Sequence, residues 1–162
     1  METEADRSGR VLILGIGNTL LSDDGFGVHV TEKLRGDFCF SDNVSIRDGG
    51  TIGLALLPEI EETDQLIVID AGELKDAPGA MRVFEGEAMD KHLSASHGSV
   101  HEVAMSDLLE AAALMGRTPK DRALVVVQPK SLDWGDAPTE SVAAAIPKAC
   151  KTIASLIEGW RS

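Results

Sequence analysis

The chain has 162 residues and a mass of 17.2 kDa, which suits one domain, spanning residues 1–162, with a single core. Its 43% hydrophobic and 26% charged residues are typical of a globular protein. Its formal net charge of −12 argues against DNA, RNA or an anionic membrane surface as a partner, because binding to phosphates relies on Lys and Arg. No apolar run approaches the roughly 20 residues that span a bilayer, and residues 1–10 lack the apolar centre of a signal peptide, so we expect a cytoplasmic protein with no membrane-inserted segment.

Short apolar runs alternate with helix-period segments along the chain. We expect strands at residues 10–15, 44–47, 65–70, 81–84 and 123–127. We expect helices at residues 25–34, 51–61, 101–114 and 138–158, with a polar loop between residues 85 and 100. The strand at 65–70 is apolar at every position from Leu66 to Ile69, as parallel strands buried on both faces are. This order predicts an α/β fold, a three-layer α/β/α sandwich with a mostly parallel, five-stranded twisted sheet.

An acid pair, Asp23–Asp24, follows the turn Gly15-Ile16-Gly17 at the point where the first helix should begin. A phosphate-binding turn keeps this position neutral and rich in glycine, so that an anion can approach the helix N-terminus. Two carboxylates there would repel phosphate, and the third glycine of a dinucleotide-binding turn is missing at the usual distance. The pair therefore favours a bound cation over the rival interpretation, a Rossmann-type nucleotide-binding protein.

Further polar residues stand at the expected carboxyl ends of the strands, where ligands bind in sheets of this kind. Asp48 follows the second strand, Asp70 closes the third, and His101 opens a helix. Carboxylates and an imidazole together suit a divalent transition-metal ion. Each residue also has an ordinary structural explanation, since Asp at such positions is commonly a helix cap or a turn former. The spacing alone leaves a metal-binding crevice and a set of unrelated turns as alternatives.

The remaining sequence features exclude familiar kinds of site. Cys39 and Cys150 are far apart, lie in apolar surroundings and form no C-x-x-C pair, so we expect both to be buried. The chain contains neither the His-Glu-x-x-His motif of zinc peptidases nor the Gly-x-Ser-x-Gly turn of serine hydrolases. We interpret Trp134 and Trp160 as packing residues.

Five ordered segments, which span nearly the whole chain, carry a further signal. They are Gly15-Ile16-Gly17-Asn18-Thr19-Leu20-Leu21-Ser22-Asp23-Asp24-Gly25-Phe26-Gly27, Asp48-Gly49-Gly50-Thr51-Ile52-Gly53, Val68-Ile69-Asp70-Ala71, Ser99-Val100-His101-Glu102-Val103 with Ser106-Asp107-Leu108-Leu109, and Gln128-Pro129-Lys130-Ser131-Leu132-Asp133-Trp134-Gly135. Together they resemble the motifs of the [NiFe]-hydrogenase maturation endopeptidases. The resemblance implies an endopeptidase that removes the C-terminal extension of a [NiFe]-hydrogenase large-subunit precursor after nickel insertion. A non-catalytic scaffold that binds this precursor without cleaving it stays as an alternative.

The resemblance also assigns roles to individual residues. It implies that Asp24, Asp70 and His101 contact the metal, and that Asp24 and Asp48 are catalytic candidates, with Asp48 linked to substrate or nickel recognition. Nickel is the expected metal, delivered in the substrate rather than held by the free enzyme. His101 matches the histidine motif better than the nearby His97 does. At the start of a helix we expect a neutral His101, because the positive helix N-terminus disfavours imidazolium.

Overall fold

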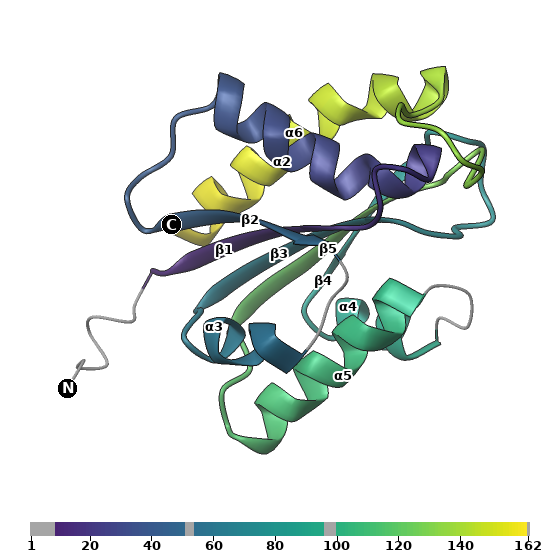
Figure 1. The fold of residues 1–162 in the computed structure, drawn as a ribbon. Coiled ribbons are helices and arrows are strands. Elements are labelled where there is room, and N and C mark those ends of the chain that lie inside the picture. The colour runs from purple at the N-terminus through teal and green to yellow at the C-terminus, as the bar shows by residue number, and fades with distance from the viewer. Residues whose placement is uncertain (1–8, 51–53, 96–99, 162) are drawn as a thin grey trace.

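The computed structural model describes residues 9–50, 54–95 and 100–161, and its fold is the expected three-layer α/β/α sandwich (Figure 1). A five-stranded sheet forms the middle layer, with the strand order β2-β1-β3-β5-β4. The strands are β1 (Val11–Ile16), β2 (Val44–Gly50), β3 (Gln65–Ala71), β4 (Met81–Glu85) and β5 (Asp121–Val127). Neighbouring strands are parallel except β4 and β5, which are antiparallel. The mostly parallel sheet expected from the sequence is confirmed.

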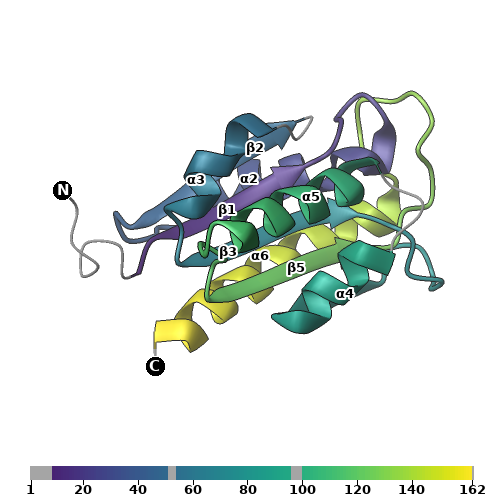
Figure 2. The ribbon, with the colours of Figure 1, turned by 90° about the horizontal axis from the view of Figure 1, so that it is seen from below.

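Helices cover both faces of this sheet. One face carries α2 (Phe26–Asp37) and α6 (Glu140–Arg161), and the other carries α3 (Leu57–Glu61), α4 (Glu87–Ala95) and α5 (Val100–Leu114) (Figure 1, Figure 2). Two short 3₁₀ helices, η1 (Ser22–Gly25) and η2 (Leu54–Leu56), precede α2 and α3. Because side chains alternate along a strand, β1 and β3 supply both apolar cores. Ile13 and Ile67 belong to the core under α2 and α6, whereas Leu12 and Leu66 belong to the core under α3, α4 and α5.

Two glycines let the start of α2 lie close to the sheet. A Cβ atom at Gly27 would lie 2.3 Å from the carbonyl oxygen of Ile69 on β3, so any larger residue would push α2 away. Gly17, just after β1, has a φ of +126°, and a Cβ atom there would lie 1.9 Å from the carbonyl oxygen of Asp24. Glycine adopts this backbone region without the strain that other residues meet. The two glycines therefore hold the segment with Asp24 against the carboxyl ends of β1 and β3.

The structure differs from the sequence-based expectations in three stretches of the backbone. Of the helix expected at residues 51–61, residues 51–53 lie outside the described residues, Leu54–Leu56 forms the 3₁₀ helix η2, and only Leu57–Glu61 is α-helical. Part of the expected polar loop between residues 85 and 100 forms α4, whose buried apolar residues are Met89 and Leu93. Two apolar positions one turn apart are too few to make a helical period visible in the sequence. The sequence also predicts that the second strand ends before Asp48, but β2 continues through Gly50.

Two expectations about single side chains are also wrong. Cys39 is exposed, and only Cys150 is buried. The chain is extended after α2, and the flanking Phe38 and Phe40 pack against the core, so alternation turns the side chain between them outward. Trp134 is 82% exposed in the loop between β5 and α6 and is not a packing residue, whereas Trp160 does pack against the core.

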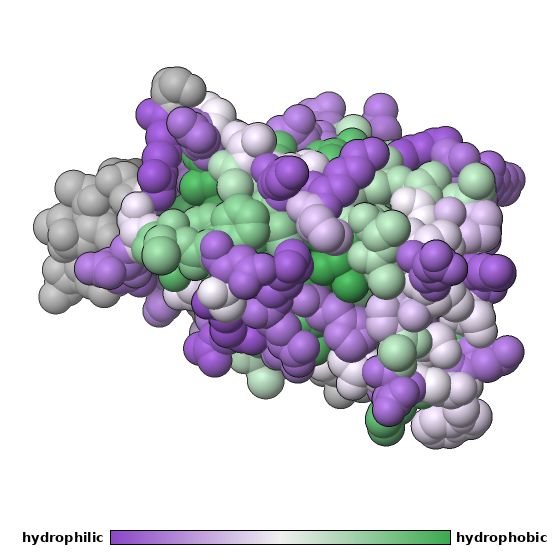
Figure 3. Space-filling view, turned by 90° about the horizontal axis from the view of Figure 1, so that it is seen from above, coloured by the Kyte–Doolittle hydropathy of each residue, from purple (hydrophilic) through white to green (hydrophobic). Residues whose placement is uncertain are grey.

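The face of the molecule that carries α2 and α6 is largely polar (Figure 3). On the face that carries α2 and α6, hydrophilic side chains surround smaller areas of apolar side chains (Figure 3). This pattern is usual for surface helices that bury one apolar stripe. Among the described helices, none combines the length and the apolar composition needed to cross a membrane.

Candidate functional site

The candidate site lies at the carboxyl ends of the adjacent strands β1 and β3. α2 leads from β1 to β2 over one face of the sheet, and α3 leads from β2 back to β3 over the other face. Ligands in open α/β sheets bind at the edge where the connections diverge in this way. Asp24 lies in η1 after β1, Asp70 is the penultimate residue of β3, and His101 is the second residue of α5.

Asp24 and His101 contact each other directly. The Nε2 atom of His101 lies 3.2 Å from Oδ2 of Asp24, and the same oxygen accepts a hydrogen bond of 2.9 Å from the backbone N–H of Asn18. The His101 side chain is 17% exposed and the Asp24 side chain 13%. Both groups are thus mostly withdrawn from water, with a small part of each left accessible to a ligand.

Each partner of this pair shifts the pKa of the other. Burial raises the pKa of Asp24, but the hydrogen bonds from His101 and Asn18 outweigh burial and lower that pKa overall. The hydrogen bond to Asp24 raises the pKa of His101, against the opposing effect of burial. This shift runs opposite to the one expected from the helix N-terminus, because the adjacent carboxylate favours the protonated ring. A proton on the ring competes with a metal ion for His101.

Asp70 is completely buried at the end of β3. Its Oδ1 atom accepts a hydrogen bond of 2.8 Å from the backbone N–H of Ala71, and within the described part of the chain its Oδ2 atom has no hydrogen-bond partner. Burial, followed by the charges of Glu102 and Asp24, raises the pKa of Asp70 well above its ordinary value. Asp70 therefore keeps its proton to a higher pH than an ordinary carboxyl group, and its second oxygen keeps unused hydrogen-bonding capacity.

The three residues expected to contact metal are thus brought to one edge of the sheet. Asp24 contacts His101, and the charge of Asp24 acts on Asp70. Among residues 9–50, 54–95 and 100–161, no three His, Cys, Asp or Glu side chains are spaced to hold a metal ion on their own. His97, the weaker candidate ligand, lies outside the described residues.

A buried acid behind His101 has no role in the sequence-based account. Glu102 is 2% exposed, and its Oε1 atom lies 3.7 Å from Nε2 of His92 on α4. The ring of His92 stacks on Phe84, with the ring centroids 4.1 Å apart. A Cβ atom at Gly72 would lie 2.4 Å from Oε1 of Glu102, so the glycine makes room for this carboxyl group. The Glu that follows His101 in the histidine motif was the only sequence signal for this contact.

Asp23 does not face the Asp24–His101 pair. It is fully buried, and its carboxylate accepts hydrogen bonds from the backbone N–H groups of Lys130, Ser131 and Thr139 and from the Thr139 hydroxyl. Burial opposes ionisation, but these hydrogen bonds outweigh it and lower the pKa of Asp23. The acid pair is therefore divided, because Asp24 lines the site and Asp23 holds the loop between β5 and α6.

Asp48 stands apart from the other predicted site residues. It pairs with Gly15 across β1 and β2, its side chain is exposed, and its Oδ1 atom accepts a hydrogen bond of 2.8 Å from the backbone N–H of Gly50. Within the described residues, no hydrogen bond or ion pair joins Asp48 to Asp24, Asp70 or His101. Its catalytic role stays a prediction.

The family model of the hydrogenase maturation proteases matches residues 28–156 of this chain. The chain belongs to the hydrogenase maturation protease family. The hydrogenase expression/formation protein HupD of Rhizobium leguminosarum bv. viciae is 41% identical over 152 residues, which cover 93% of this chain and 75% of HupD. The hydrogenase 2 maturation protease of Escherichia coli (strain K12) is 37% identical over 145 residues, which cover 89% of this chain and 88% of that protein. The structure of the hydrogenase maturating endopeptidase HybD from E. coli is 37% identical and superposes with a TM-score of 0.87 over 93% of both chains.

Exposed apolar side chains occur on three segments at or next to the candidate site of this protein. They come from the β1–η1 loop, the start of α5 and the β5–α6 loop, and are Leu20 (55% exposed), Val100 (83%), Val103 (47%), Leu132 (53%) and Trp134 (82%). Exposed apolar side chains that gather on one surface are typical of contacts with other proteins. A maturation protease has a protein as its substrate, so apolar side chains on these segments fit the family.

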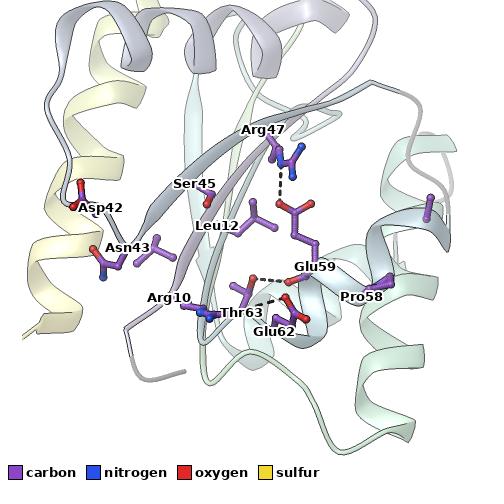
Figure 4. Close-up of a pocket in the computed structure, with 12 residues that line it drawn as sticks. Arg10, Leu12, Asp42, Asn43, Ser45, Arg47, Pro58, Glu59, Glu62 and Thr63 are labelled. Atoms are coloured by element: carbon purple, nitrogen blue, oxygen red, sulfur yellow. Dashed lines mark hydrogen bonds and ion pairs between the residues drawn. The ribbon is translucent and has the colours of Figure 1, made fainter. Parts of the chain in front are cut away.

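A cavity of about 500 Å³ lies near the opposite ends of β1 and β2 (Figure 4). Arg10 and Asn43 line it where the two strands begin, and Glu59 and Glu62 line it from α3 and the residue after it. Two ion pairs lie in its lining, since Arg47 Nε donates to Glu59 Oε1 at 2.8 Å and Arg10 Nη1 lies 3.8 Å from Glu62 Oε2. We assign this cavity no part in the reaction of the family.

Proposed function

We propose that this protein is an endopeptidase that removes the C-terminal extension of a [NiFe]-hydrogenase large-subunit precursor after nickel insertion. Membership of the hydrogenase maturation protease family supports this proposal. The single observation that carries the site assignment is the contact of 3.2 Å between His101 and Asp24 at the same sheet edge as Asp70, which is buried and has one oxygen without a partner in the described residues.

Asp24, Asp70 and His101 offer two carboxylates and one imidazole nitrogen, a donor set that suits a divalent ion such as nickel. In this proposal the nickel belongs to the substrate and arrives already bound by the precursor. The raised pKa values of His101 and Asp70 mean that protons compete with nickel for these atoms. The site would therefore exchange protons for the metal only when a loaded precursor docks.

Peptide hydrolysis also needs a group that takes a proton from the attacking water. Asp24 is the first candidate because its carboxylate lines the site and is ionised at neutral pH. Asp48 is the second catalytic candidate, since it is exposed near the carboxyl end of β2. Nickel could in addition polarise the scissile carbonyl group.

A cleavage assay with matched variants tests this proposal. Purified protein is mixed with nickel-loaded precursor, and the products are read by intact mass. The wild-type protein and Asp136→Asn, which removes one exposed carboxylate, should release a C-terminal peptide, whereas Asp24→Asn and His101→Ala should not. Wild-type cleavage by the His101→Ala variant would contradict the site assignment. Binding of the precursor without any cleavage by the wild-type protein would favour the scaffold alternative.

A further inference from the structure

Asp23 has no part in the proposed reaction, yet its buried carboxylate accepts hydrogen bonds from several donors. Oδ1 accepts from the Thr139 N–H at 2.7 Å, and Oδ2 accepts from the N–H groups of Lys130 at 2.8 Å and Ser131 at 3.0 Å. The Thr139 hydroxyl lies within 2.9 Å of both oxygens. All of these donors belong to residues 130–139, the loop between β5 and α6.

Backbone contacts join the same two segments. Ser22 N–H donates to the Gly135 carbonyl at 2.9 Å, Gly135 N–H donates to the Leu20 carbonyl at 2.9 Å, and Asp23 N–H donates to the Ser131 carbonyl at 3.1 Å. The Ser22 hydroxyl donates to the Asp133 carbonyl at 2.8 Å. Residues 20–23 and 130–139 therefore form one hydrogen-bonded unit, and the carboxylate of Asp23 is its buried centre.

The position of Asp24 depends on this unit. Asp23 and Asp24 are neighbours in η1, and in a 3₁₀ helix successive side chains are turned by about 120°. With Asp23 held by the 130–139 loop, the side chain of Asp24 is turned toward His101, and its Oδ2 atom receives the N–H of Asn18 at 2.9 Å. Loss of the Asp23 carboxylate contacts would leave only the backbone bonds of Ser22 and Asp23 and the Ser22 hydroxyl to hold η1 on the 130–139 loop.

We propose that Asp23 is a positioning residue for the cleavage reaction: it fixes η1 on the 130–139 loop and so holds Asp24 where it meets the metal-bearing substrate. This inference rests on the proposed function. Asp23 touches no reacting atom, and it acts through Asp24.

Three variants test the role of Asp23. Asp23→Asn replaces one acceptor oxygen with an NH₂ group that faces N–H donors, so it should break the unit. Thr139→Val removes the hydroxyl that bonds both oxygens, and Thr139→Ser keeps it. Asp136→Asn removes a charge from the same loop without touching Asp23 and is the matched control.

The main readout is the single-turnover rate constant for nickel-loaded precursor at saturating enzyme, because this constant does not depend on the fraction of enzyme that is folded. We expect a loss of about 10-fold to 100-fold for Asp23→Asn, since small errors in the placement of a reacting group have effects of this size. Thr139→Val should show a smaller loss, and Thr139→Ser and Asp136→Asn should match the wild-type protein. If Asp23→Asn does not fold, the comparison of Thr139→Val with Thr139→Ser decides.

Amide hydrogen exchange gives a second readout that does not need activity. Exchange at Ser22 and Gly135 should become faster in Thr139→Val, with exchange in β1 and β3 unchanged. Variants with faster exchange at these amides but wild-type single-turnover constants would overturn the positioning role while wild-type cleavage still supports the proposed function. Absence of cleavage by the wild-type protein itself would overturn the proposed function first, and the positioning role with it.

Discussion

The stability of Asp70→Asn relative to the wild-type protein should increase as the pH rises, while the substitution disables the candidate site. Burial and the charges of Glu102 and Asp24 raise the pKa of Asp70 well above its ordinary value. The same carboxyl group titrates at about pH 4 in an unfolded chain. The folded protein therefore binds this proton more tightly than the unfolded chain does. The contribution of Asp70 to the free energy of unfolding is most favourable below about pH 4 and falls as the pH rises toward the folded pKa.

The slope of this effect follows from linkage. One proton held by the folded state alone lowers the free energy of unfolding by roughly 1 to 1.5 kcal/mol for each pH unit across the window. Asp70→Asn removes that titration and keeps an oxygen for the Ala71 N–H. The new NH₂ group would be buried without an acceptor in place, which adds a cost of about 1–3 kcal/mol that does not change with pH. The slope, rather than the value at one pH, is the prediction.

Urea unfolding of Asp70→Asn and the wild-type protein at about pH 5, 6 and 7 measures this slope. The difference in unfolding free energy should shift in favour of Asp70→Asn as the pH rises toward the folded pKa of Asp70. The exposed Asp136→Asn variant should give a flat difference. A flat difference for Asp70→Asn as well would refute the raised pKa, and retained cleavage of nickel-loaded precursor by Asp70→Asn would refute its contact with the metal.

Three further predictions concern the surroundings of this carboxyl group. His101→Ala should abolish precursor cleavage with an unchanged circular dichroism spectrum; an active variant would count against metal contact by this ring. The cleavage rate should rise as the pH passes the pKa of His101, which lies above its ordinary value of about 6.5, because nickel needs the unprotonated ring. Asp24→Asn should lower the His101 pKa in an NMR titration; an unchanged His101 pKa would contradict the pairing of His101 with Asp24. Gly72→Ala should destabilise the fold by about 1–3 kcal/mol in urea unfolding, because its Cβ atom would meet Glu102 at 2.4 Å, whereas Gly36→Ala, with open space around it, should not; equal stabilities would contradict the close contact.

The central strands were predictable because a run of apolar residues marks each of them in the sequence. β1, β3 and β5 are apolar on both faces, as only strands covered by helices on two sides can be, and their predicted bounds agree with the structure to within two residues. α4 was missed because most of its surface meets solvent and only Met89 and Leu93 are buried. A helix or strand is therefore easier to predict from local sequence when most of its residues are buried than when only a few are.

The site was predictable in its location and less so in its chemistry. The rule for sheet edges and the family motifs both point to Asp24 and His101, and the structure brings these two into contact. The sequence did not show that Asp23 and Asp24 have different roles. Contacts of Asp23 with a loop more than 100 residues further along the chain decide that Asp24, and not Asp23, lines the site. The direction of the His101 pKa shift was not predictable for the same reason, since the helix terminus is a local feature and the Asp24 contact is not.

The most direct test of the account compares two forms of one substrate. Purified protein is incubated with nickel-loaded and nickel-free large-subunit precursor from the same host, and intact mass spectra are recorded over time. We expect loss of a C-terminal peptide from the loaded precursor alone, because Asp24, Asp70 and His101 would engage the nickel that it carries. Equal cleavage of both forms would contradict nickel recognition by this site.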